Sequence, residues 1–214
     1  AYLLFEFKLT RSMAILGTLL KKGISLGESL EQQYTSAAEL QKAELRKLLI
    51  QAQQTEFGRA YCFNDLLKAF KKHDDEYYIA FRNLVPVFDY NLIFEKWWHK
   101  AKDGQQNICW PGKIRYFALS SGTSGASSKY IPVTKDIIKS MHRTSVRQIL
   151  TLSKYDLVGD DFTKGILMLG GSTNLRKHGT YFEGDLSGIT TSQVPFWLQA
   201  FYKPGKRIAK TADW

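Results

Sequence analysis

Leu119-Ser-Ser-Gly-Thr-Ser-Gly-Ala-Ser-Ser-Lys129 brings six hydroxyl side chains, two glycines and one lysine together in a single short segment. Glycines let a backbone bend so that successive N–H groups converge on an anion. Hydroxyls add hydrogen-bond donors, and a lysine ammonium neutralises phosphate as a point charge. The composition of this segment therefore favours a loop that binds the phosphates of a nucleotide.

The residues on either side of the segment predict extended structure. Residues 114–119 are β-branched and aromatic, which is typical of a strand. Residues 129–133 include Pro132, which biases the residue before it toward extended conformations. Thr134 is expected to cap a helix that begins at Lys135. The predicted order is strand, loop, short strand and helix.

This order differs from the two best-known phosphate-binding motifs. In a Walker loop the lysine opens directly into a helix, whereas Lys129 precedes a strand. The glycines do not follow the G-x-G-x-x-G spacing of a dinucleotide fingerprint. The remaining alternative is a flexible Ser/Gly linker. A linker rarely lies between two apolar strands, so phosphate binding is the better interpretation.

Other short motifs follow the same order as in one known family. Together with the loop, they resemble the auxin-responsive family of acyl-acid amido synthetases, bacterial members above all, within the adenylate-forming superfamily, over residues 13–214. Ordered agreement over this length is more specific than any single motif. The motifs are Thr-Glu-Phe-Gly-Arg at 55–59, Val-Pro-Val at 85–87, Trp-Pro-Gly at 110–112, Gly-Gly-Ser at 170–172, Tyr-Phe-Glu-Gly-Asp-Leu-Ser at 181–187, Val-Pro-Phe-Trp at 194–197 and Asp-Trp at 213–214.

The resemblance implies an α/β fold, the N-terminal part of the large domain of an adenylate-forming enzyme. Residues 13–214 are expected to form an incomplete adenylation domain, and the family's C-terminal domain is expected to lie beyond the sequence. Residues 13–103 would be mostly helical, and residues 104–214 would be α/β and carry the phosphate loop. Residues 1–12 are either a non-native extension or an ordinary first helix.

The resemblance also implies a reaction. An ATP-dependent ligase would adenylate a carboxylic acid and join it to an amino acid or amine, with ATP and Mg²⁺ as cofactors and the ion held chiefly by ATP oxygens. This chain alone is expected to be inactive as an enzyme. No catalytic residue and no metal ligand is assigned within it. The expected phosphate-binding residues are Ser120, Ser121, Gly122, Thr123, Ser124, Gly125 and Lys129.

The acyl substrate has weaker candidates. Arg143 and Arg147 lie four apart on the helix after the loop and could hold a carboxylate, with Arg147 the better candidate. A basic pair in solvent beside Asp136 is the favoured alternative. Gly171 and Ser172 follow a predicted strand, where ligands meet open α/β sheets. A tight turn is the alternative for these two residues.

Two other functions stay open: an acyl-CoA-type ligase and a non-catalytic module that binds nucleotides or polyanions. The net charge of +10 invites the latter. The basic residues are dispersed, however, and no nucleic-acid-binding motif accompanies them, so no nucleic-acid partner is expected. Residues 13–20 are too short for a bilayer, which needs ~20 apolar residues, so no membrane association is expected. Cys62 and Cys109 form no disulfide pattern and are expected to be buried in a cytoplasmic protein.

Helix signals dominate the first half of the chain. Residues 36–53 predict an amphipathic helix. Asn64 is expected to cap a helix that ends at Lys72, and Asp89 to cap one that ends near Lys100. In the second half, residues 165–169 are wholly apolar and predict a strand buried on both faces. The helix after Asp89 is expected to bury Leu92, Ile93, Phe94 and Trp97.

Overall fold

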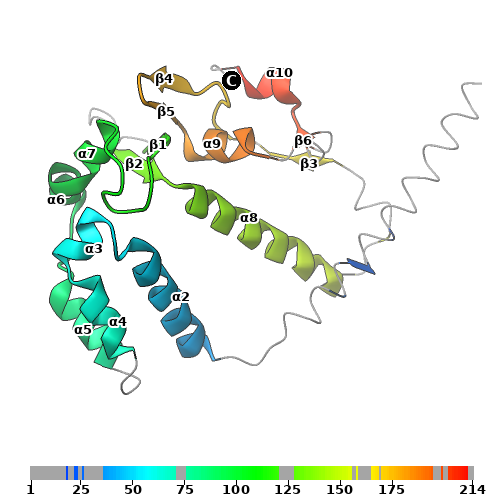
Figure 1. Ribbon diagram of the computed structural model, residues 1–214. Helices are drawn as coiled ribbons and strands as arrows, with labels where there is room; N and C mark the ends of the chain where they lie inside the picture. Colours follow the sequence, from blue (N-terminus) through cyan, green and yellow to red (C-terminus); the bar gives the residue numbers. More distant parts are fainter. Residues whose placement is uncertain are drawn as a thin grey trace, which may run out of the picture. The chain divides into compact units, whose positions relative to one another are not determined.

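The chain folds into two compact units. The computed structural model (Figure 1) describes residues 18, 22, 23, 26, 36–70, 76–120, 128–155, 158, 165–168, 170–194, 199 and 202–211. One unit, which we name the loop unit, comprises residues 35–134 and 175–189. The other, the pocket unit, comprises residues 1–34, 135–174 and 190–214. The predicted alternatives for residues 1–12 lie outside the described residues.

The loop unit begins with the helix α2, Ala37–Ala52. Ser36 caps it through a capping box, in which the Ser36 hydroxyl accepts the Glu39 N–H and the Glu39 carboxylate accepts the Ser36 N–H. Such a box satisfies two backbone donors that the first turn leaves unpaired. The helix predicted over residues 36–53 is confirmed.

Three short helices pack with α2: α3 Glu56–Ala60, α4 Phe63–Ala69 and α5 Glu76–Leu84 (Figure 1). Leu49, Ala52, Phe63 and Leu66 form their buried core.

Two details of the sequence prediction at α4 are wrong. The helix begins at Phe63 after Cys62, whose φ of 50° is left-handed, so Asn64 lies inside the helix and does not cap it. Cys62 is exposed rather than buried, because it occupies the turn between α3 and α4.

A longer helix follows in three segments: α6 Tyr90–Ile93, the π-helical turn η1 Phe94–Trp98 and α7 His99–Lys102. Asp89 caps it as predicted, since its carboxylate accepts the Leu92 N–H at 2.8 Å. The expectation that Leu92 is buried is wrong: it is 38% exposed. Trp97 does pack against buried residues, as expected.

The sheet of the loop unit has four strands in the order β2-β1-β5-β4. They are β1 Tyr116–Leu119, β2 Tyr130–Val133, β4 Arg176–His178 and β5 Tyr181–Gly184. β2 is antiparallel to β1, β5 is parallel to β1, and β4 is antiparallel to β5. The two strands predicted on either side of the loop are confirmed.

A second buried cluster supports this sheet. Phe117 of β1 is fully buried and packs with Ala101 of α7 and with Ile108 and Ile114, which precede β1. Gly104 ends α7 at a φ of 92°, and a Cβ on it would meet Thr180 at 3.2 Å. Positive φ and close approach both favour glycine at this position.

The pocket unit contains α8 Lys135–Leu150, the 3₁₀ turn η2 Thr151–Lys154, and two short parallel strands, β3 Ile166–Leu167 and β6 Tyr202–Lys203. Its last helix is α10 Lys206–Ala209, and α9 Leu186–Ser192 starts in the loop unit and ends in the pocket unit. The strand expected to be buried on both faces is instead exposed where it is described, with Leu167 at 70%, because among the described strands β3 pairs with β6 alone.

The architecture is mixed α/β, with a helical first part followed by strands, as the sequence predicts. The predicted division at residues 103 and 104 stays a prediction. Within the described part of the chain, no helix has both the length and the hydropathy that crossing a bilayer requires.

Candidate phosphate-binding site

The two ends of the hydroxyl-rich segment are held together at the point where β1 ends and β2 begins. Leu119 and Tyr130 are partners in the β1–β2 ladder. One residue further, the Ser120 N–H donates to the Lys129 carbonyl at 3.1 Å, and the Lys129 N–H donates to Ser120 Oγ at 3.2 Å. Residues 120–129 therefore connect two antiparallel strands through a closed neck, the arrangement predicted from the sequence.

Only the two ends of the predicted phosphate-binding set are described. Ser120 is partly buried, and its hydroxyl oxygen accepts the Lys129 N–H. A serine hydroxyl can also donate its own proton. Lys129 is exposed. The other predicted members lie outside the described residues: Ser121, Gly122, Thr123, Ser124 and Gly125.

Tyr90, the first residue of α6, holds the exit of the loop. Its hydroxyl oxygen accepts the Tyr130 N–H at 2.8 Å, and the Lys129 ammonium lies 5.2 Å from the centre of its ring. An aromatic face attracts a cation without cancelling its charge. In the described part of the chain no ion pair joins Lys129 to a carboxylate.

A second lysine lies at the same place. Lys102, at the end of α7, has its ammonium 3.5 Å from the centre of the Tyr130 ring. The Tyr90 ring itself packs against Phe94 and Trp98, at 5.6 and 6.2 Å between ring centres. The helix that Asp89 caps thus fixes both the tyrosine and the lysine beside the loop exit. Sequence analysis missed Tyr90 and Lys102, because nothing in the local sequence indicates that this helix meets β2.

A second strand, β5, runs parallel to β1 and ends on the same side of the sheet. The carboxyl ends of parallel strands meet at one edge of a sheet, which is where ligands bind open α/β sheets. Ser120 follows β1 there, and Asp185 follows β5. The Asp185 carbonyl accepts the Ile189 N–H at 2.9 Å, which begins α9.

A buried carboxylate ties β5 to β4 beneath this edge. Glu183 is 3% exposed, and its Oε1 lies 3.1 Å from Arg176 Nη2 and 3.1 Å from His178 Nε2. Its Oε2 has no hydrogen-bond partner among the described residues. Burial, followed by the charge of Glu183, raises the pKa of Tyr181 above its usual value. This cluster links two neighbouring strands, and we assign it no role in phosphate binding.

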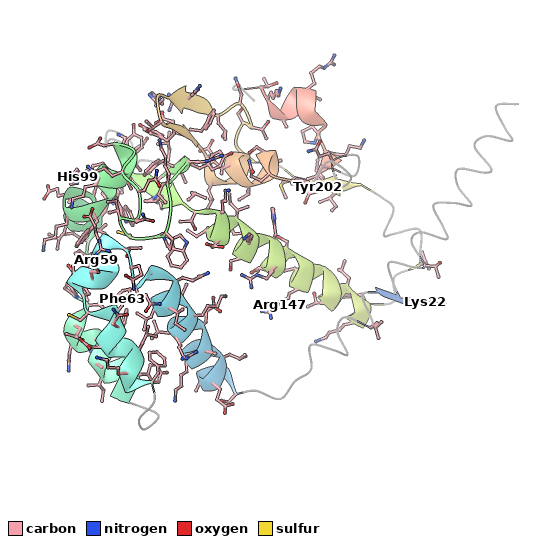
Figure 2. All side chains as sticks on the ribbon, in the orientation of Figure 1. Lys22, Arg59, Phe63, His99, Arg147 and Tyr202 are labelled. Carbon is pink, nitrogen blue, oxygen red and sulfur yellow. The ribbon has the colours of Figure 1, made fainter. Side chains whose placement is uncertain are left out.

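The candidate acyl-binding residues lie in the pocket unit. Arg143 and Arg147 are both exposed on α8, and Figure 2 labels Arg147. Ser172 Oγ donates to the Lys210 carbonyl at 3.0 Å and accepts the Asn174 N–H at 3.1 Å, which fits the tight-turn alternative.

A cavity of about 230 Å³ lies beside this turn. Thr173 lines it and also borders a smaller cavity with Gly171. Both the N–H and the hydroxyl of Thr173 donate to the Ala209 carbonyl, at 2.8 and 3.1 Å. The sequence did not predict this cavity, because its walls come from several separate segments between Thr173 and Lys210. The residues that complete its lining are Thr191, Ser192, Val194, Gln199, Tyr202, Pro204, Ala209 and Lys210.

The Cys109 thiol is not available as a nucleophile. Burial raises the pKa of its thiol to about 12, so the thiol stays protonated at neutral pH. The described residues contain no group of three His, Cys, Asp or Glu side chains arranged to bind a metal ion.

Comparison with known proteins identifies the family. The model of the GH3 family N-terminal domain matches residues 27–213. Among solved structures, the chain is similar to a GH3.15 acyl acid amido synthetase, with a TM-score of 0.65 and 22% identity. That match covers 90% of this chain and 32% of the other, so the chain spans about a third of that protein's length. No curated protein matches. The resemblance predicted from the sequence is confirmed, and the chain belongs to the GH3 family.

Proposed function

We propose that the loop at residues 120–129 binds the β- and γ-phosphates of ATP in a ligase that adenylates a carboxylic acid and joins it to an amino acid or amine. The observation that carries the proposal is the closed neck of the loop, with the exposed Lys129 ammonium seated on Tyr90. A flexible linker would need neither a strand register at its ends nor a fixed cation. Membership of the GH3 family supports the same reaction class.

The chemistry explains why such a loop is needed. A carboxylate resists attack by amines because its oxygen is a poor leaving group. When the carboxylate attacks the α-phosphate of ATP, pyrophosphate leaves and the acid becomes an acyl adenylate. The amine then displaces AMP. Negative charge accumulates on the departing pyrophosphate, and the N–H groups and hydroxyls of the loop, together with Lys129, would stabilise that charge.

Mg²⁺ fits this site through the nucleotide. The ion prefers phosphate oxygens and water, and usually takes only one or two protein carboxylates. The two charged side chains seated on the tyrosines at the loop exit are lysines, Lys102 and Lys129. ATP is therefore expected to carry the ion into the site, where the ion would neutralise phosphate charge alongside Lys129.

The acyl substrate is assigned to the pocket unit. The cavity of about 230 Å³ has a volume suited to a small acid, and Lys210 is among its lining residues, so its ammonium is our candidate partner for a carboxylate. Gly171 lies at its smaller neighbour, and Ser172 orders the turn beside it. Arg143 and Arg147 complete the proposed set. The free thiols of Cys62 and Cys109 support residence in the reducing cytoplasm. We propose no nucleic-acid or membrane partner.

Carboxylate-dependent exchange of labelled pyrophosphate into ATP tests the proposal in the full protein that carries this chain. We expect exchange with at least one acid from a panel. Lys129→Ala should raise the KM for ATP about tenfold, the cost of one charge-assisted contact. Lys96→Ala, which removes an exposed lysine from η1, is the matched control and should change nothing.

Two results would favour the other candidates. Exchange followed by acyl transfer to a thiol and not to any amine would favour an acyl-CoA-type ligase. Absence of exchange with every acid, together with salt-dependent polyanion binding that survives Lys129→Ala, would favour a non-catalytic module. For the acyl site, Arg147→Ala should raise the KM for the acid and leave the KM for ATP unchanged.

A further inference from the structure

Two lysines and two tyrosines lie together at the exit of the loop, and each lysine contacts one tyrosine ring. Lys129 lies over the ring of Tyr90, and Lys102 lies over the ring of Tyr130. The two tyrosines are joined directly, since Tyr90 Oη accepts the Tyr130 N–H at 2.8 Å. Both ammonium groups therefore contact tyrosines that are hydrogen-bonded to each other, at the point where the chain leaves the loop. We name these four residues the exit clamp.

The way each lysine is held determines whether its charge is available. Lys100, two residues before Lys102 on α7, forms an ion pair with Glu56 at 2.7 Å, so its charge is compensated within the fold. Lys102 has no ion pair with a carboxylate in the described part of the chain. A ring holds an ammonium in place by its quadrupole and leaves the net charge intact. Lys102 is also partly buried, which limits the range of positions its side chain samples.

We propose that Lys102 is a second polyphosphate-binding lysine, and that Tyr90 and Tyr130 are positioning residues for Lys129 and Lys102. The proposal rests on the proposed function, because it takes the loop to bind a triphosphate. A triphosphate and the pyrophosphate that leaves it carry several negative charges, which one lysine and one Mg²⁺ do not fully compensate. Two preorganised ammonium groups at the loop exit supply the missing charge without a protein metal ligand.

Direct binding measurements test this proposal without relying on turnover. The dissociation constants of MgATP and of inorganic pyrophosphate are measured by titration calorimetry on the full protein. Lys102→Gln should weaken both by about tenfold, as expected for loss of one charge-assisted contact. Lys102→Arg, which keeps the charge, should stay within about threefold of the unmodified protein. Lys96→Gln makes the same charge change on an exposed part of the same helix and should have no effect.

The outcomes separate this proposal from the one it rests on. If the unmodified protein binds neither MgATP nor pyrophosphate, the proposed function fails. If it binds them and Lys102→Gln binds equally well, Lys102 is not a phosphate ligand and the inference is overturned. Thermal melts check folding of each variant. If Lys102→Gln unfolds, Lys102→Met is measured in its place, because it keeps an apolar stem on the Tyr130 ring. If Lys102→Arg then loses as much affinity as Lys102→Met, the inference is also overturned.

Discussion

Because the Glu183 carboxylate is buried, replacing Glu183 and replacing its partner Arg176 should change the free energy of unfolding by different amounts. Its partner Arg176 is 69% exposed, whereas Glu183 is 3% exposed. Arg176→Met leaves a buried carboxylate with His178 as its remaining partner, and we expect a loss of about 1–2 kcal/mol after allowing for solvent screening of the arginine. Glu183→Met removes the buried charge together with the unpartnered Oε2, and the freed Arg176 stays in solvent. This change should cost less than about 1 kcal/mol or stabilise the protein.

Urea unfolding followed by tryptophan fluorescence measures both effects. The double variant completes a thermodynamic cycle, and it should be about as stable as Glu183→Met alone, because Arg176 has nothing left to compensate. The opposite ranking, with Glu183→Met costing more than Arg176→Met, would refute the reasoning. It would mean that the carboxylate stabilises the sheet by more than its desolvation costs.

Three further predictions concern single residues of the loop unit. Gly58→Ala should lower the free energy of unfolding by about 3 kcal/mol, because a Cβ there would overlap the Ala52 carbonyl oxygen; urea titration measures it, and an unchanged midpoint would contradict it. The pKa of the Cys109 thiol is raised to about 12, so iodoacetamide at about pH 8 should modify it only after denaturation, as mass spectrometry would detect; ready labelling in the folded protein would be the contrary result. Tyr90→Phe keeps the ring but leaves the Tyr130 N–H without its acceptor, and should cost about 1–2 kcal/mol of stability with a smaller effect on ATP affinity than Tyr90→Leu.

Local signals in the sequence predicted much of the fold. Ser36 and Asp89 each precede a helix that their side chains cap, because capping depends only on residues within one turn. The strands on either side of the loop were predicted from β-branched residues and Pro132, which act over similarly short distances. At these two helix starts and these two strands, the local signal was sufficient.

The errors arise where distant parts of the chain determine the outcome. Residues 166 and 167 form an apolar strand that the pattern assigned to a buried sheet, yet β6 is its one partner among the strands that the structure describes, and the strand is exposed. The start of α4 is a local exception, because it depends on the left-handed φ of Cys62, a conformation that cysteine rarely adopts. The site follows the same rule: Lys129 was found within its motif, whereas Tyr90 lies about forty residues away and is brought to the loop by packing alone.

Lysine reactivity tests the central claim most directly. The full protein is treated with an amine-acylating reagent with and without saturating MgATP, and the modification of each lysine is quantified by mass spectrometry. If the loop binds the triphosphate, MgATP should protect Lys129 by about tenfold, while the exposed Lys96 reacts equally in both samples. Equal modification of Lys129 with and without MgATP would contradict phosphate binding at this loop.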